Sequence, residues 1–160
     1  MTVTRIWLTN WEWDCCGTAF AVGDRVVLNT SSQVDPWFAE MLGNDLADGI
    51  DAVETHHDDP GPDAVAGIVE AIHGVTLAHT VRREPRPADA PRPEPLALGE
   101  GVWAVAGSRD PWITVSEPVP GSASLVPAPH VPWPARGAEP DEHAAPPPGL
   151  AGYLVDVTVE

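Results

Sequence analysis

The sequence predicts a mainly β protein, built as one small antiparallel barrel with a short helical insertion and proline-rich loops. Short β-branched and aromatic segments recur along the 160 residues, which suit a single domain over 1–160. One interval, 31–59, changes to helical spacing. Sixteen of the nineteen prolines lie from Pro85 onward, and two stretches, 83–95 and 121–149, are the proline-rich excursions.

The first strands are expected near the N-terminus. Residues 3–9, V-T-R-I-W-L-T, are β-branched and aromatic and predict a strand. Residues 11–17 are interpreted as a connection, and 18–22 as a short apolar segment. Gly23-Asp24 indicates a turn before a second strand at 25–29.

The helical insertion begins with a recognisable start signal. Asp35 suits the N-cap and Pro36 the first helical position. Gly43 should divide the insertion into two short helices. Asp45 would cap the second helix, and the chain should pass into a loop at 54–62. The apolar stripe of that second helix would comprise Leu46, Ile50 and Val53.

Residues 64–82 predict two strands that turn at His73-Gly74, and Gly67 favours strand over helix for the first of them. The fragment V-A-G-I-V-E-A-I, residues 65–72, resembles a pattern of SH3-like barrels. We therefore expect the barrel to be SH3-like. Further strands are expected at 96–106 and 111–118. Residues 150–160 alternate cleanly between two faces, which predicts the last strand.

The charge balance excludes several classes of partner. The chain has 24 acidic residues, 8 arginines and no lysine, for a net charge of −16. Such a surface repels phosphate backbones and anionic lipid, so neither nucleic acid nor membrane is an expected partner. The N-terminus lacks the features of a signal peptide, and no apolar run reaches the roughly 20 residues of a membrane span. We therefore expect a cytoplasmic protein with reduced thiols.

The N-terminal motif resembles a known family. The pattern W-x-x-x-C-C-G-x-x-F-x-V-G-D runs from Trp11 to Asp24, and the tail G-Y-L-V-D-V lies at 152–157. With fragments at 42–47 and 56–57, these residues resemble an uncharacterised family of small actinobacterial proteins, a domain of unknown function. The resemblance implies one fold over most of the chain and implies no activity or catalytic residues.

Two pairs of side chains are candidate metal ligands. Cys15 and Cys16 supply thiolates and His56 and His57 supply imidazoles, the ligands that zinc prefers. Adjacent cysteines point in different directions on a strand, which weighs against the site. The alternatives are one cysteine packed in the core, a vicinal disulfide, or a nucleophile activated by a histidine. No cofactor is expected unless these side chains hold a metal, which would be zinc or else copper(I).

Three tryptophans are candidate partner-binding residues, namely Trp11, Trp13 and Trp37, because small barrels bind ligands on aromatic faces. The alternative is that they pack in the core. Standard nucleotide-binding and hydrolase motifs are absent from the sequence. The sequence thus favours a non-enzymatic module that binds a protein or a small ligand, and the alternative is a metal-binding protein that uses the cysteine and histidine pairs.

Overall fold

Strands dominate the structure, a computed structural model that describes residues 1–55, 63–88, 95–99, 102–105, 111–132 and 149–159. The prediction of a mainly β protein is therefore confirmed. The chain divides into two units. We call Met1–Ala78 with Pro118–Glu160 the sheet unit, and His79–Glu117 the ribbon unit.

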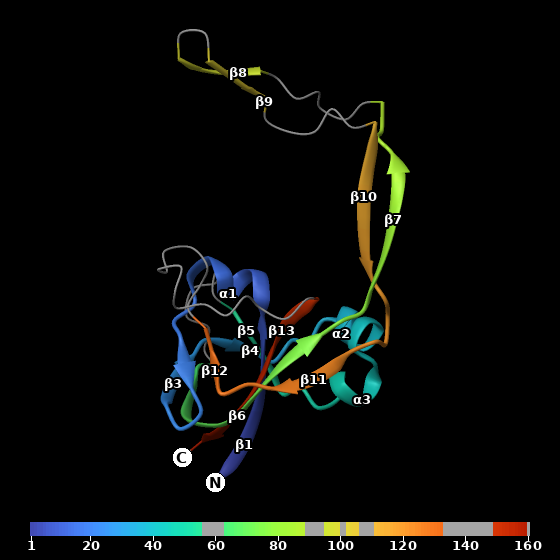
Figure 1. Cartoon of the computed structure of the whole chain (residues 1–160). Helices are drawn as coiled ribbons and strands as arrows, with labels where there is room; N and C mark the ends of the chain where they lie inside the picture. Colours follow the sequence, from blue (N-terminus) through green and yellow to red (C-terminus); the bar gives the residue numbers. More distant parts are fainter. Residues whose placement is uncertain (56–62, 89–94, 100–101, 106–110, 133–148, 160) are drawn as a thin grey trace. The chain divides into compact units, whose positions relative to one another are not determined.

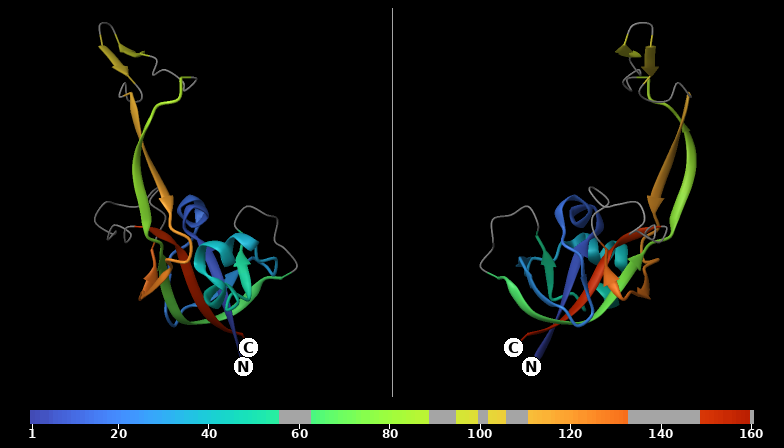
Figure 2. Two further views of the ribbon diagram at one scale, coloured as in Figure 1. Left: turned by 90° about the vertical axis from the view of Figure 1, so that its right-hand side faces the viewer. Right: turned by 60° about the vertical axis from the view of Figure 1, so that its left-hand side comes forward.

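Three long strands form the centre of the sheet unit (Figure 1). Strand β13 (Leu150–Val159) lies between β1 (Thr2–Thr9) and β6 (Val65–Thr76), antiparallel to both. Thr2 pairs with Val159, so the two ends of the described chain lie side by side (Figure 2). The expected first and last strands are confirmed, since β1 pairs with β13 along its whole length.

The sheet curls into a half-barrel. Beyond β1 lie β5 (Ala52–Glu54), which is parallel to β1, and then β4 (Thr30–Ser31). At the opposite edge, β6 pairs with β3 (Arg25–Leu28) along its first half. Only Asn29 separates β3 from β4, so one bent segment pairs with both ends of the curled sheet.

The second half of β6 pairs with β11 (Ser124–Pro127) on the same edge that β3 occupies. Next to it, β2 (Phe20–Ala21) pairs with β12 (His130–Val131). The prediction of a turn at His73-Gly74 was wrong, because β6 continues through both residues. Gly74 has neighbours on both sides, since it pairs with Tyr153 of β13 and with Val126 of β11.

Helix α2 (Pro36–Leu42) follows the predicted start signal, because the Asp35 side chain accepts a hydrogen bond from the Trp37 backbone N–H at 2.8 Å. Gly43 has a φ of 87° and separates α2 from α3 (Asn44–Ala47), as expected. The prediction that Asp45 caps the second helix was wrong, because Gly43 holds the N-cap position of α3 and Asp45 lies in its first turn. The second helix is shorter than predicted: α3 ends at Ala47, and Ala52–Glu54 form the strand β5.

A third helix, α1 (Asn10–Cys16), occupies the stretch that was interpreted as a connection. Its residues are poor helix formers, so tertiary packing of Trp13 has to stabilise it. No helix in the described part of the chain is long and apolar enough to cross a membrane.

Buried side chains form two clusters, one on each face of the curled sheet. The inner cluster fills the concave side and includes Leu8, Trp13, Phe20, Ile72 and Val155. The outer cluster lies under α2 and α3 and includes Trp7, Phe38, Leu42, Val75 and Leu154. Successive side chains of β13 enter the two clusters in turn, so both faces of this strand are apolar.

The described residues of the ribbon unit form two separate strand pairs. Strand β7 (His79–Pro85) pairs with β10 (Trp112–Pro118), and β8 (Pro95–Gly99) pairs with β9 (Val102–Val105). Arg82 bonds both carboxylate oxygens of Glu117 across the first pair. The 83–95 stretch, expected as a linker, therefore begins within β7, while β11 and β12 lie within the 121–149 stretch, of which 133–148 is outside the described residues.

Candidate functional site

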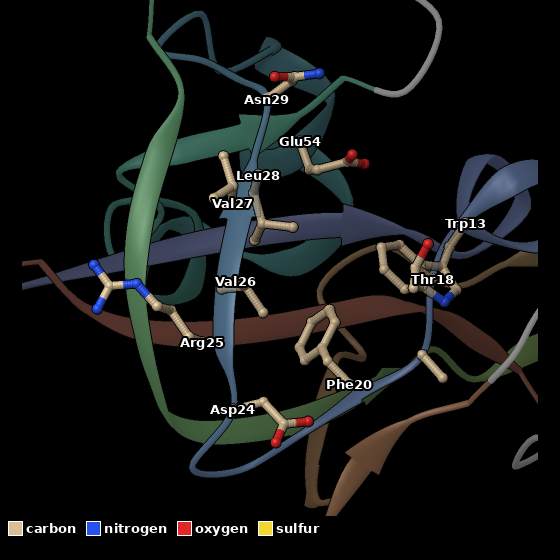
Figure 3. Close-up of a pocket in the computed structure, with 11 residues that line it drawn as sticks. Trp13, Thr18, Phe20, Asp24, Arg25, Val26, Val27, Leu28, Asn29 and Glu54 are labelled. Atoms are coloured by element: carbon tan, nitrogen blue, oxygen red, sulfur yellow. The ribbon is translucent and has the colours of Figure 1, made fainter.

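A pocket of about 490 Å³ opens on the concave side of the sheet unit, beside β3 (Figure 3). The pocket is lined by residues from four segments. These are helix α1, residues 18–20 at the start of β2, strand β3 with the residues on either side of it, and the end of β5. The lining side chains that matter for its chemistry are Trp13, Thr18, Phe20, Val26, Leu28 and Glu54. The pocket therefore joins the apolar inner cluster to a buried carboxyl group, that of Glu54.

The aromatic wall of the pocket consists of Trp13 and Phe20. Their rings meet edge to face, with centroids 5.4 Å apart and planes at 90°. The Trp13 indole N–H donates a hydrogen bond to the Pro132 carbonyl at 3.0 Å. Gly17 lies directly under this indole, because a Cβ there would come within 2.4 Å of the ring. The hydrogen bond to Pro132 and the close packing over Gly17 together hold the Trp13 ring in the wall of the pocket.

Glu54 is the buried polar residue among the described residues that line the pocket. It is the last residue of β5, pairs with Thr30 of β4, and is only 3% exposed. Figure 3 shows its carboxyl group pointing toward the side of the pocket that carries Trp13. Burial raises the pKa of Glu54 to about 8, and the charge of Glu12 on α1 adds to the increase. Near neutral pH the group is therefore mostly a neutral acid, which can donate a hydrogen bond or release a proton.

The rim of the pocket is a tight turn between β2 and β3. Gly23 has a φ of 93°, and the Asp24 carboxylate accepts a hydrogen bond from the Ala21 backbone N–H at 2.8 Å. The turn is attached to β6 by two backbone hydrogen bonds with Val69, of 2.8 and 2.9 Å. The predicted Gly23-Asp24 turn is confirmed, and it holds one edge of the pocket in place.

A second pocket of about 410 Å³ shares Phe20 and Asp24 with the first. It is also lined by His130 and Val131 of β12 and by Pro132, which follows that strand. Because β2 pairs with β12, the two pockets use the same short strand. This second pocket lacks a buried ionisable side chain among its described lining residues.

The structure places only part of the candidate metal set. Cys15 is an exposed free thiol on α1, and Cys16 ends that helix. His56 and His57 lie outside the described residues. Within the described ranges, no three His, Cys, Asp or Glu side chains are grouped to hold a metal ion. The zinc hypothesis therefore stays a prediction, which metal analysis of the purified protein would test.

The three candidate tryptophans lie in different environments. Trp11 is 66% exposed and Trp37 is 40% exposed, whereas Trp13 is 2% exposed and belongs to the inner cluster. Trp37 packs edge to face against Phe38, with ring centroids 5.3 Å apart. Of the three, Trp13 is the one that lines the pocket.

Glu54 was missed by the sequence reasoning, which placed it at the start of a loop after a helix. A local signal exists, since Val53 and Thr55 are β-branched and flank it at the spacing of a strand. That pattern alone does not reveal which face is buried. Glu54 is positioned by the pairing of β5 with β4. Its neighbour Glu12, on α1, is a second cause of its raised pKa.

Comparison with known families places nearly the whole chain in one family. A family model for a family of unknown function, DUF6578, matches residues 2–159, so the chain belongs to that family. Comparisons with curated proteins and with solved structures find no match. The resemblance to a domain of unknown function is thereby confirmed, and the chemistry has to be argued from the site.

Proposed function

We propose that this protein binds a small organic ligand in the pocket beside β3. The observation that carries the proposal is that two aromatic rings and one buried carboxyl group line the same pocket. Ligand sites typically combine apolar walls with a few placed polar groups, in volumes of roughly 300–1,000 Å³. The volume of about 490 Å³ falls within that range.

Binding is proposed in preference to catalysis because of the titratable groups that are present. Glu54 is the one buried ionisable side chain among the described lining residues. Acid–base or covalent catalysis usually requires a second positioned group, a base or a nucleophile, within hydrogen-bond reach. A single carboxyl group is sufficient to orient a polar substituent of a ligand.

The walls of the pocket are also well supported. Phe20, Val26 and Leu28 belong to the inner cluster, and the turn at the rim is bonded to β6. A site whose side chains are held by packing binds with a smaller ordering cost. These features favour a preformed site.

The proposal is tested by screening a fragment library with ligand-observed NMR. Thr18 lies exposed at the pocket, so Thr18→Trp should fill the opening without removing a core side chain. Ser32→Trp adds the same ring at an exposed position that does not line the pocket. Fragments should bind the native protein and the Ser32 variant, and binding should be lost in the Thr18 variant. The absence of hits, or equal binding to both variants, would exclude this pocket as the site.

A further inference from the structure

We infer that the ligand of this pocket is a short extended peptide without acidic side chains, which adds a strand to the side of β3 that faces away from β6. The inference rests on the proposed function and specifies the ligand class. It follows from three features of the described residues: how β3 lines the pocket, where the backbone groups of β3 point, and the charge of the unit that contains it.

The pocket runs along the backbone edge of β3. All of the strand, Arg25–Leu28, lines it, together with Asp24 and Asn29 at the two ends. Successive side chains of a strand point to opposite faces, and in β3 Val27 is 69% exposed whereas Val26 is 8% exposed. A pocket on one face would be lined by every second residue. Consecutive lining residues from both faces therefore indicate that the pocket lies against the edge.

Backbone groups of β3 point toward this edge. The strand is antiparallel to β6, and the Asp24 carbonyl accepts a hydrogen bond from the Val69 N–H at 2.9 Å, which continues the register of the pair. Residues that bond the partner strand alternate with residues that do not, so Val26 and Leu28 bond β6. The N–H and C=O groups of Val27 then point away from β6. Among the described strands, β6 is the one that pairs with β3.

The chain itself shows that this side of the segment accepts a partner. The backbone groups of Asn29 point in the same direction as those of Val27, and its carbonyl accepts a hydrogen bond from the Thr55 N–H at 2.9 Å. Thr55 directly follows β5, which pairs with β4. A peptide in the pocket would continue this pairing along β3. A segment of about four residues matches the length of the strand, and main-chain hydrogen bonds of this kind are a common mode of peptide binding.

The walls of the pocket favour apolar side chains on one face of such a peptide. Side chains of paired strands lie beside one another on each face of a sheet. On the inner face the neighbours in β3 would be Val26 and Leu28, which belong to the inner cluster. Trp13 lies across the pocket from β3 in Figure 3, and Phe20 meets it edge to face. A peptide with apolar residues at alternate positions therefore matches the pocket.

The charge of the sheet unit disfavours an acidic peptide. The ribbon unit contains five arginines and six acidic residues, so it carries −1 of the net charge of −16, and the sheet unit carries −15. Such a field repels anionic ligands and raises the local concentration of cationic ones. The side chains on the outer face of the peptide should therefore be neutral or basic.

The test uses a display library of random heptapeptides, selected against the full chain and counter-selected against the Thr18→Trp variant, in which the pocket is filled. Selected peptides should have apolar residues at alternate positions and few acidic ones. Each backbone amide of the best peptide is then N-methylated in turn. Methylation at alternate positions should weaken binding by about tenfold, because those N–H groups donate to β3, and methylation at the intervening positions should change it little.

A pair of proline variants tests the backbone of β3. Val27→Pro removes the N–H that points toward the pocket and leaves the bonds to β6, so it should weaken peptide binding by about tenfold. Leu125→Pro is the matched control on β11, because the Ala128 N–H bonds Ile72 of β6 and the register then directs the Leu125 N–H away from β6. Leu125 does not line the pocket, so peptide binding should be unchanged.

The outcomes separate the inference from the proposal beneath it. If no peptide is selected, or if N-methylation weakens binding without a period of two residues, the peptide inference is overturned. Fragments that bind the native protein and not the Thr18 variant would then still support a ligand pocket. Selection of mainly acidic peptides would contradict the charge argument. The N-methylated series uses the native protein, so it remains decisive even if Val27→Pro does not fold. If neither peptides nor fragments bind, the proposed function fails as well.

Discussion

Glu54 gives the folded chain a dependence on pH that one substitution should remove. Its pKa in the fold is about 8, against an ordinary value of 4.5. Below pH 4.5 both folded and unfolded chains hold the proton, and the stabilisation is complete. As pH rises toward 8 the unfolded chain ionises first, so the free energy of unfolding falls.

We therefore predict that Glu54→Gln gains stability relative to the native protein as pH increases. The difference should grow between pH 4.5 and 8, by on the order of 3–5 kcal/mol, and then level off. Urea unfolding at several pH values measures it, and Glu40→Gln should show a nearly constant difference. A constant difference for the Glu54 variant would mean that this carboxyl group ionises normally in the fold.

Two glycines in the central sheet should respond oppositely to the same substitution. A Cβ at Gly152 would lie 2.3 Å from the Leu8 carbonyl oxygen and 2.6 Å from the Trp7 ring. A Cβ at Gly74 would find its nearest atom at 3.5 Å, an ordinary contact. Gly152→Ala should therefore cost about 1–3 kcal/mol of unfolding free energy, whereas Gly74→Ala should be neutral or slightly stabilising. Denaturant unfolding of both variants tests this, and equal effects would contradict the packing argument.

At the scale of elements, the cap of α2 is a local signal whose contribution can be isolated. Asp35→Ala removes the acceptor for the Trp37 N–H and should cost about 1 kcal/mol. Asp35→Asn removes the same charge but keeps a side-chain oxygen at the N-cap, so it should cost a few tenths at most. Thermal or denaturant unfolding distinguishes the two variants. If they lose the same stability, the charge and not the hydrogen bond is what matters.

The elements that the sequence predicted correctly are those with local causes. Strand β1 is rich in β-branched and aromatic residues, β13 alternates between two faces, and α2 has both a cap and a proline at its start. The elements that were missed depend on distant contacts. Helix α1 has weak intrinsic propensity and is stabilised by packing of Trp13, and β5 is a strand because β1 and β4 lie on either side of it.

The candidate site divides in the same way. The Gly23-Asp24 turn was predicted from the sequence, and Trp13 was a partner-binding candidate, with core packing as the alternative; both lie in one continuous stretch of the chain. Glu54 comes from a strand more than twenty-five residues further along, and its burial results from the curl of the sheet. Cysteines and histidines were the candidate chemical groups, since the sequence does not indicate which carboxylate is buried.

At the scale of the whole molecule, the ribbon unit is an insertion between two strands of one hairpin. Strands β6 and β11 pair antiparallel in the sheet unit, and 79–117 lies between them in the chain. The two ends of the insertion meet, because the Val119 N–H donates to the Ala78 carbonyl at 2.8 Å. The Ala78 N–H in turn donates to the Ser122 hydroxyl at 3.0 Å.

This arrangement predicts that the sheet unit folds without the ribbon unit. Replacing 79–117 with Asn-Gly leaves a short hairpin loop at the point where the chain already closes. Both buried clusters and the pocket lie within the sheet unit, so they should be retained. A shorter loop also costs less closure entropy, so the free energy of unfolding should be unchanged or higher by about 1–2 kcal/mol.

Denaturant unfolding and the fragment screen together measure the outcome, with a second variant that carries a longer Gly-Ser linker at the same junction. Both variants should unfold cooperatively and bind the same fragments as the full chain, because the pocket draws its side chains from the sheet unit. A variant that folds but loses fragment binding would show that the ribbon unit contributes to the site. Failure of both variants to fold would mean that the sheet unit requires the insertion for its stability.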